Sequence, residues 1–267
     1  MCTNDIRRLS LGECSEAYLT DVKGKIQAHV FIFVEEDRIS LLSVPGQAER
    51  IIAHLGRYII REDVELADTT NERNWAMVVG PASEALLMDS ALNLQCLKAS
   101  VSLLWPGGFL VRHDGSDSLC EKVELPLIDT TSLAWTALRV ESQLPLFGTD
   151  FDDSNLPQEV NRDLQAISFN KGCYLGQETV ARIDALGHVN KKLILVSIGS
   201  QSVPDSGSKL MRGDTEVGSI TSASWSPQLS RPLALAFVKR GANELGCEMD
   251  SSVGKGVVVA ARNASDL

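Results

Sequence analysis

The sequence lacks the features that mark metal-binding, disulfide-rich and membrane-spanning proteins. Its six cysteines are scattered without a C-x-x-C pair, which excludes the usual zinc spacing, and a disulfide framework is not expected in a chain of 267 residues. No stretch reaches the roughly 18 apolar residues that a membrane helix needs. The first ten residues contain no apolar signal-peptide core. We therefore expect a protein of the reducing cytoplasm, with no metal site and no membrane partner.

Aromatic and basic residues are scarce as well. Only 5% of the residues are aromatic, so the core has to be largely aliphatic. The 25 Lys and Arg residues face 35 Asp and Glu residues, which gives a net charge of −10. That charge opposes nonspecific binding to nucleic acid, although a locally basic pocket can still hold an anionic ligand. The 44% hydrophobic fraction is that of a globular chain and excludes a disordered one.

Hydrophobic periodicity predicts an α+β N-terminal part. Apolar, β-branched runs at 25–34 and 38–44 flank an acidic triplet, as in a β-hairpin. The elements expected next are a helix, two strands and a helix, at residues 48–59, 64–67, 75–79 and 80–87. This order is typical of a ferredoxin-like α/β sandwich.

The sequence after Asn190 has a different character. A helix is predicted over 132–141, before a turn-rich stretch, and only short strands follow. They are expected at 192–198, 209–211, 217–222, 233–238 and 256–261. Short strands separated by Gly, Ser, Pro and Asp predict a small all-β barrel or sandwich as a separate C-terminal domain.

Residues 171–182 carry a concentration of reactive side chains. We predict a helix that begins near Tyr174, which would place Cys173 at its N-terminus and two residues from Lys171. The positive end of the helix dipole and a nearby cation both favour a thiolate. Gly172 would permit a tight approach of the backbone to that helix.

Two plain alternatives stay open for this stretch. A single cysteine is more often a small buried hydrophobe than a nucleophile. Glu178 and Arg182 stand four residues apart and can form an ordinary solvated ion pair on one helix face. The density of different polar groups around two glycines favours a functional site over both alternatives.

The stretch Lys171–Glu178 reads K-G-C-Y-L-G-Q-E and matches K-G-C-Y-x-G-Q-E, the signature of the YgfZ family of folate-binding proteins. That family is related in fold to the T-protein of the glycine cleavage system. Other stretches of this chain resemble the same proteins, at Thr3–Lys25, Leu138–Gly148, Pro157–Asn161 and Val217–Ser222.

The resemblance implies a glycine cleavage T-protein-like, α+β multi-domain ring with ferredoxin-like sandwich parts and a C-terminal β-barrel. Residues 1–44 and 129–190 would form the folate-binding domain, 45–128 a ferredoxin-like subdomain and 191–267 the barrel. Tetrahydrofolate would bind in a central channel. The family's first strand and helix would precede Met1, so either a piece of the folate domain is missing or an earlier start codon exists.

The resemblance also implies roles for individual side chains towards tetrahydrofolate or a substituted folate. Cys173 would be the reactive position, with Lys171 and Tyr174 as further catalytic candidates. The Glu141 carboxylate would accept N–H donors from the amide-like edge of the pterin. Lys171 and Arg182 would supply cations for the anionic glutamyl tail. The remaining candidate folate ligands are Arg139, Gln177 and Glu178.

One departure from the T-proteins bears on the reaction. Those proteins carry an aspartate pair after a glycine-rich turn, and one of the two is catalytic. Alignment on Gly24 places Gln27 and Ala28 at the corresponding positions. Neither side chain ionises, so general acid–base chemistry has no candidate group there.

Three functions of different classes remain. The first is a tetrahydrofolate-binding protein that supports the assembly or repair of iron–sulfur cluster enzymes, with iron–sulfur client or assembly proteins as partners. The second is a folate-dependent aminomethyltransferase, which Gln27 and Ala28 disfavour. The third is a scaffold that has lost its ligand. The residues alone identify neither the client enzyme, the folate form, the chemical role of Cys173 nor the oligomeric state.

Overall fold

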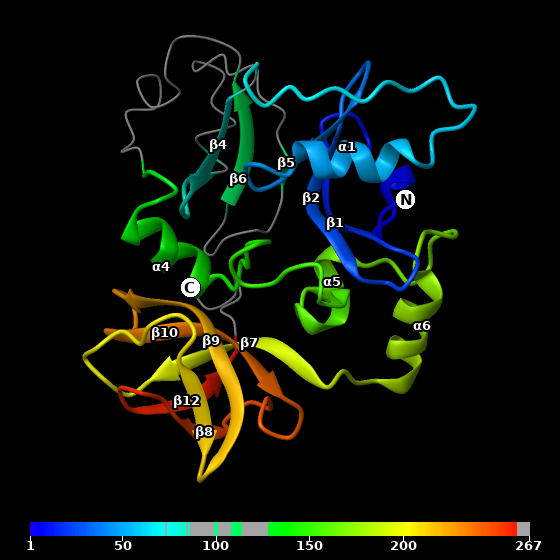
Figure 1. Cartoon of the computed structure of the whole chain (residues 1–267). Helices are drawn as coiled ribbons and strands as arrows, with labels where there is room; N and C mark the ends of the chain where they lie inside the picture. The colour runs from blue at the N-terminus through cyan, green and yellow to red at the C-terminus, as the bar shows by residue number, and fades with distance from the viewer. Residues whose placement is uncertain (73, 84, 86–98, 101–107, 114–127, 261–267) are drawn as a thin grey trace. The chain divides into compact units, whose positions relative to one another are not determined.

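The computed structural model describes residues 1–72, 74–83, 85, 99–100, 108–113 and 128–260 (Figure 1). The chain divides into two compact units. The N-terminal unit comprises Met1–Ser102, Gly107–Pro126 and Arg162–Ala181, and the barrel unit comprises Leu103–Pro106, Leu127–Asn161 and Arg182–Leu267. Each unit is therefore assembled from segments that are far apart in the sequence.

The N-terminal unit is built on an antiparallel sheet in the order β1-β2-β3. Its strands are β1 (Cys14–Thr20), β2 (Ile26–Val34) and β3 (Ile39–Leu42). The predicted hairpin is the β2–β3 pair, in which Val34 faces Ile39. Helix α1 (Ala48–Gly56) contributes Ile51 to the core that packs against this sheet. The other fully buried members of that core are Cys2, Ala17, Leu19, Ala28, Val30 and Ile32.

A second three-stranded sheet lies in the same unit, in the order β4-β6-β5. Its strands are β4 (Asn74–Val79), β5 (Ala99–Ser100) and β6 (Gly108–His113). The rings of Phe33 in β2 and Trp75 in β4 pack with their centroids 4.5 Å apart. The described part of the unit also contains the 3-10 helix η1 (Ile6–Arg8), α5 (Asp163–Ala166) and the first half of α6 (Gln177–Leu186).

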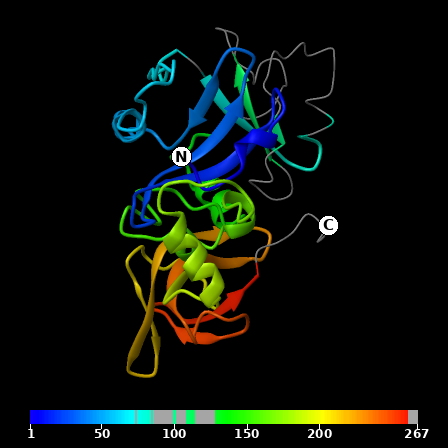
Figure 2. The ribbon, with the colours of Figure 1, turned by 90° about the vertical axis from the view of Figure 1, so that its right-hand side faces the viewer.

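The barrel unit contains a closed six-stranded barrel in the order β10-β7-β12-β11-β8-β9, yellow to red in Figures 1 and 2. Its strands are β7 (Lys191–Ile198), β8 (Lys209–Arg212), β9 (Thr215–Ser226), β10 (Arg231–Lys239), β11 (Glu248–Asp250) and β12 (Lys255–Val259). The core is aliphatic, as the low aromatic content predicts, and is centred on Val196, Ile198, Leu210, Ile220 and Val238.

Helix α4 (Leu133–Glu141) packs on β9 and β10 of the barrel. The Ser132 hydroxyl caps its N-terminus by accepting the backbone N–H of Trp135 at 3.1 Å. The 3-10 helix η3 (Pro157–Glu159) lies in the same unit and contacts β7. The predicted helix over 132–141 is therefore confirmed almost to the residue.

The structure differs from the sequence expectations at four points, one of which is a set of strands that was not expected. Residues 64–67 form no strand: the stretch is crowded with carboxylates and Val64 is 56% exposed. Helix α1 ends at Gly56 rather than at residue 59. Strands β1, β5, β6 and β11 were not predicted. Residues 84, 86 and 87 of the helix expected over 80–87 lie outside the described residues.

The last of these differences concerns the helix expected to start near Tyr174. It begins at Gln177, because Gly176 has φ +78°, a left-handed conformation that cannot continue into an α-helix. Cys173 therefore lies four residues before the first helical residue. The expected influence of the helix dipole on its thiol does not apply, since that field is confined to the terminal turn.

No helix among the described residues is both long enough and apolar enough to cross a membrane.

Candidate functional site

The segment Lys171–Gly176, named here the signature loop, joins α5 to α6 in the N-terminal unit. Gly172 and Cys173 are exposed at its tip, while Lys171 and Tyr174 are half-buried. The Cys173 sulfur is a free thiol. The thiol is thus presented to solvent, and the alternative of a buried structural cysteine is wrong.

Lys171 holds the first end of the loop. Its Nζ donates hydrogen bonds to the backbone carbonyls of Cys2 and Asn4, both at 2.7 Å. The same ammonium lies 5.3 Å from the centroid of the Tyr174 ring, within the range of a cation–π contact. An ammonium has three donors, so two of those on Lys171 anchor the N-terminal segment.

Tyr174 acts in this loop as a neutral group. Burial, with a smaller effect from Cys2, raises the pKa of its phenol to about 12. The phenol is therefore protonated at neutral pH and cannot serve as a base there. Its backbone N–H donates to the Gln177 side-chain oxygen at 3.3 Å, so Gln177 also stabilises the loop from within.

The second end of the signature loop lies on the turn between β1 and β2. The hydroxyl of Thr20 donates to the Leu175 carbonyl at 2.6 Å. A Cβ placed on Gly176 would lie only 2.6 Å from the Cα of Gly24 and would overlap the Asp21 carbonyl oxygen. The second glycine of the signature is therefore required for backbone-to-backbone packing.

The other described cysteines are less accessible than Cys173. Cys2 is buried, with its thiol donating to the Asn4 carbonyl at 3.3 Å. Burial, reinforced by the nearby Glu16 carboxylate, raises the pKa of Cys14 to about 12. Cys247 is half-buried against the barrel core. Cys173 is thus the exposed thiol among the four that the structure describes.

Arg139, a predicted folate ligand, is buried and bound to protein groups in the barrel unit. Its Nη1 pairs with an Asp150 carboxylate oxygen at 2.8 Å, and its Nη2 donates to the Ser222 hydroxyl at 2.6 Å. Asp150 also accepts the Leu146 backbone N–H and the Thr221 hydroxyl. This network ties α4 to β9 and places Arg139 in the framework of the unit.

Glu141 occupies the last turn of α4 and is half-buried. Its Oε1 accepts a hydrogen bond from the hydroxyl of Ser226, at the end of β9. Ser226 is itself 1% exposed, so this contact orients the carboxylate. Each carboxylate oxygen has two lone pairs, and Glu141 retains the capacity to accept two further N–H donors.

Glu178 and Arg182 both lie on α6 and are exposed. Among the ion pairs of the described residues, none joins these two side chains. Glu178 falls in the N-terminal unit and Arg182 in the barrel unit. The helix therefore carries an exposed carboxylate near its start and an exposed guanidinium further along.

A buried charge cluster in the N-terminal unit was not foreseen from the sequence. Glu16 in β1 receives two hydrogen bonds from Arg162, at 2.6 and 2.5 Å, and contacts His29 Nε2 at 2.9 Å. All three residues are at most 5% exposed. The one sequence signal was a glutamate inside an apolar run, since a partner 146 positions away cannot be read from spacing.

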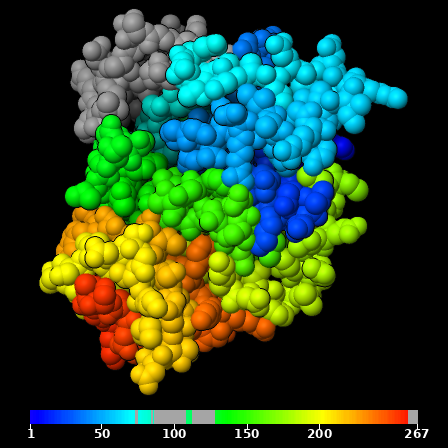
Figure 3. All heavy atoms as spheres, viewed as in Figure 1, coloured from blue at the N-terminus to red at the C-terminus, as the bar shows by residue number. Residues whose placement is uncertain are grey.

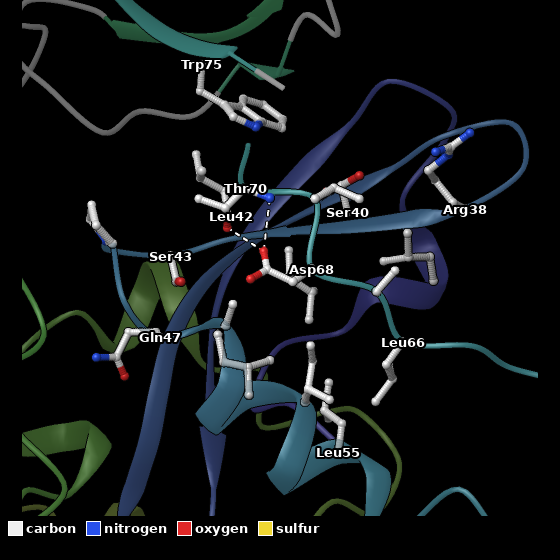
Figure 4. Close-up of a pocket in the computed structure, with 18 of the residues that line it drawn as sticks. Arg38, Ser40, Leu42, Ser43, Gln47, Leu55, Leu66, Asp68, Thr70 and Trp75 are labelled. Atoms are coloured by element: carbon white, nitrogen blue, oxygen red, sulfur yellow. Dashed lines mark hydrogen bonds between the residues drawn. The ribbon is translucent and has the colours of Figure 1, made fainter. Parts of the chain in front are cut away.

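A cavity of about 570 Å³ lies elsewhere in the N-terminal unit, between β3, α1 and residues 65–70 (Figure 4). Leu42 and Leu55 are among its apolar walls, and Trp75 lies at one end. The Asp68 carboxylate, bound to Thr70, is drawn into its centre. The neighbouring segment 57–72 is largely exposed (cyan in Figure 3). The predicted site residues do not line this cavity.

The described residues contain no cluster of three or more His, Cys, Asp or Glu side chains arranged to hold a metal ion.

The chain is similar to known proteins of two kinds. Residues 191–266 match the glycine cleavage T-protein C-terminal barrel domain. The chain is 28% identical over 222 residues to the tRNA-modifying protein YgfZ of Shigella dysenteriae serotype 1 (strain Sd197), covering 78% of this chain and 68% of that protein. The protein of the same name from Escherichia coli O157:H7 matches at the same identity and coverage.

Two aminomethyltransferases are also similar. That of Aquifex aeolicus (strain VF5) is 26% identical over 266 residues, 94% of this chain and 73% of that protein. The crystal structure of glycine cleavage system aminomethyltransferase T from Bartonella henselae superposes with a TM-score of 0.80 at 17% identity, over 96% of this chain and 76% of that one. The predicted fold class, α+β with a C-terminal barrel of glycine cleavage T type, is confirmed.

Proposed function

This chain is a YgfZ-type protein related to the glycine cleavage T fold, and on that premise we propose that it binds tetrahydrofolate and supports the assembly or repair of iron–sulfur cluster enzymes in the cytoplasm. The observation that carries the proposal is the exposed thiol of Cys173, at the tip of a loop whose two ends are anchored. Iron–sulfur client or assembly proteins are the partners that we propose for it.

The donor set of the chain fits a reduced folate. Glu141 supplies an oriented carboxylate with open acceptor sites, which suits the N–H donors at the pterin edge. Arg182 supplies an exposed guanidinium, which suits a glutamyl carboxylate. We assign the pterin to Glu141 and the glutamyl tail to Arg182. Glu178 remains a candidate ligand from the same helix.

The predicted site residues whose side chains bind other protein groups have structural roles in this proposal. Lys171 and Gln177 hold the signature loop, and Arg139 holds α4, which carries Glu141. Tyr174 contributes a neutral phenol. Folate, when bound, would supply one-carbon chemistry, while the chain's own residues bind it, orient it and present the thiol.

Tetrahydrofolate binding is tested by anaerobic titration calorimetry on the purified chain. We expect saturable binding, weakened about 10- to 100-fold by Glu141→Gln, because a hydrogen bond to a charged group contributes roughly 1.5 to 3 kcal/mol. Glu244→Gln changes an exposed carboxylate in the barrel unit and serves as the matched control. Absence of saturable binding by the unmodified chain would exclude both the folate proposal and its transferase alternative.

The iron–sulfur role is tested by complementation. A strain that lacks its own copy of such a protein should recover iron–sulfur enzyme activity with this chain and with Cys247→Ala, but not with Cys173→Ala. Cys247 is the matched control because its thiol is half-buried in the barrel unit. Full activity of Cys173→Ala would show that the thiol is not the reactive group.

The second candidate is folate-dependent aminomethyl transfer, favoured by the similarity to the Aquifex aeolicus aminomethyltransferase. Against it, the side chains of Gln27 and Ala28 do not ionise, so neither position offers a titrating group. Gln27 accepts a hydrogen bond from Arg50 at 3.3 Å, and Ala28 is buried. The deciding assay measures ammonia release from an aminomethyl-lipoyl carrier with tetrahydrofolate. Turnover in that assay would reverse the ranking of the two functions.

A further inference from the structure

The turn between β1 and β2 is braced internally before anything packs on it. The Asp21 carboxylate accepts the backbone N–H groups of Lys23 and Lys25, each at 2.8 Å. The backbone of Asp21 pairs with Lys25 and Gly24, and Gly24 has φ +77°. The turn thus presents a fixed surface, as expected for an aspartate that bonds to the backbone two residues ahead.

The signature loop rests on this surface through specific contacts. Thr20, fully buried at the end of β1, donates its hydroxyl to the Leu175 carbonyl. Gly176 packs backbone to backbone on Gly24, and the Thr179 side chain lies against the same glycine. Since Leu175 is two residues from Cys173, these contacts fix the chain immediately after the thiol.

The segment before the thiol is fixed as well, by the two hydrogen bonds of Lys171. Between the two anchors only Gly172 and Cys173 are exposed. The Lys171 ammonium and the Leu175 carbonyl therefore bind the ends of the loop to the rest of the unit. Cys173 lies between them and is exposed.

We propose that Thr20 is a positioning residue for Cys173: its hydroxyl, acting with the Gly24–Gly176 contact, locks the end of the signature loop. The inference rests on the proposed role of the Cys173 thiol. Thr20 is not proposed to touch the ligand. It acts only through the Leu175 carbonyl.

The test compares Thr20→Val, which keeps the shape but removes the donor, with Thr20→Ser, which keeps the donor. Amide hydrogen exchange reports the anchor. We expect exchange over residues 172–177 to accelerate about 10-fold in Thr20→Val, the value of one hydrogen bond, and to stay unchanged in Thr20→Ser. Exchange in the barrel strands should be unaffected by both.

Complementation then reports positioning. Thr20→Val should lower recovered iron–sulfur enzyme activity about 10- to 100-fold at equal protein level, and Thr20→Ser should restore it. If Thr20→Val does not fold, Thr20→Ala repeats the comparison without added bulk.

Each outcome has one meaning. Unchanged exchange in the loop overturns the anchor, and accelerated exchange with full activity overturns positioning while leaving the proposed function intact. Failure of Thr20→Ser to restore activity also overturns positioning by the hydroxyl. If the unmodified chain itself restores no activity, the proposed function fails, and the exchange experiment still tests the anchor by itself.

Discussion

The buried carboxylate of Glu16 makes the stability of the N-terminal unit depend on pH in the acid range. Burial alone would raise the pKa of Glu16, but the charge of Arg162 and hydrogen bonds from Arg162 and His29 outweigh it and lower the pKa to about 2. The carboxylate therefore stabilises the fold fully above its unfolded pKa, near 4.5, and this contribution is lost as the pH falls towards 2.

The free energy of unfolding should fall as the pH is lowered from about 5 towards 2. We expect protonation of Glu16 to account for about 3 kcal/mol of that fall. Urea denaturation between about pH 5 and 2.5 measures the slope, which Glu16→Gln should flatten relative to Glu244→Gln. Glu16→Gln should also lower stability at neutral pH by about 3 to 5 kcal/mol, because Arg162 is left buried without its partner charge. An acid slope equal to that of the unmodified chain would contradict the assignment.

The thiols offer a second prediction at this scale. Iodoacetamide at neutral pH should alkylate Cys173 at least about 10-fold faster than Cys2, Cys14 or Cys247, since reaction requires both access and a thiolate. Burial hinders Cys2, and the raised pKa of Cys14 hinders that residue. Peptide mass spectrometry over a time course gives the individual rates. Equal rates at Cys173 and Cys14 would argue against an accessible signature loop.

At the scale of elements, the packing of the signature loop on the β1–β2 turn depends on a glycine. Gly176→Ala should destabilise the protein by about 3 kcal/mol or more, from both positive φ and steric overlap with Asp21 and Gly24. Gly12→Ala is the matched control, because Gly12 has φ +80° with nothing near its absent Cβ, and we expect about 1 to 2 kcal/mol there. Thermal or urea unfolding compares the two. Equal losses would mean that backbone conformation alone explains Gly176.

The attachment of α4 to the barrel gives another test of an element contact. Arg139→Met should lower the free energy of unfolding by about 3 to 5 kcal/mol, because Asp150 remains buried without its cation. Arg212→Met, at an exposed position on β8, should change stability by less than about 0.5 kcal/mol. The measurement is urea denaturation at neutral pH. A small loss from Arg139→Met would mean that the Leu146 N–H and the Thr221 hydroxyl are enough to hold the Asp150 charge without the guanidinium.

Sequence patterns predicted elements well where the hydrophobic period was clear. The β2–β3 hairpin, α4 and most barrel strands follow directly from such periods. Residues 64–67 alternate like a strand but have no strand partner, and pairing cannot be read from one segment. The start of α6 was predicted three residues too early, because the positive φ of Gly176 cannot be read from the sequence.

The sequence located the candidate site, but it did not show which side chains are bound to other protein groups. The signature located Cys173, and the structure adds that its thiol is exposed. The family resemblance implied that Lys171 and Arg139 are folate ligands, and the structure shows donors of both bound to protein groups, to carbonyls and to a carboxylate. Such partners lie up to 169 positions away, beyond what local sequence can indicate.

At the scale of the whole molecule, net charge governs encounters with polyanions. A chain of charge −10 should not form a complex with bulk tRNA at about 10 µM protein and physiological salt, where nonspecific affinity needs many neutralised phosphates. An electrophoretic mobility shift, repeated at low salt, measures this. A salt-resistant complex would show a specific RNA surface that overcomes the charge.

The closure of the barrel limits how other chains can engage it. Within residues 191–260 each strand is hydrogen-bonded to a neighbour on both sides, from β10 through β7 and around to β9. Backbone paired on one side only is confined to strand ends, such as residues 191–194 of β7 and 222–226 of β9. We therefore expect a protein that binds the C-terminal domain to contact mainly its loops and side chains, because a peptide that binds by adding a strand finds only these short strand ends.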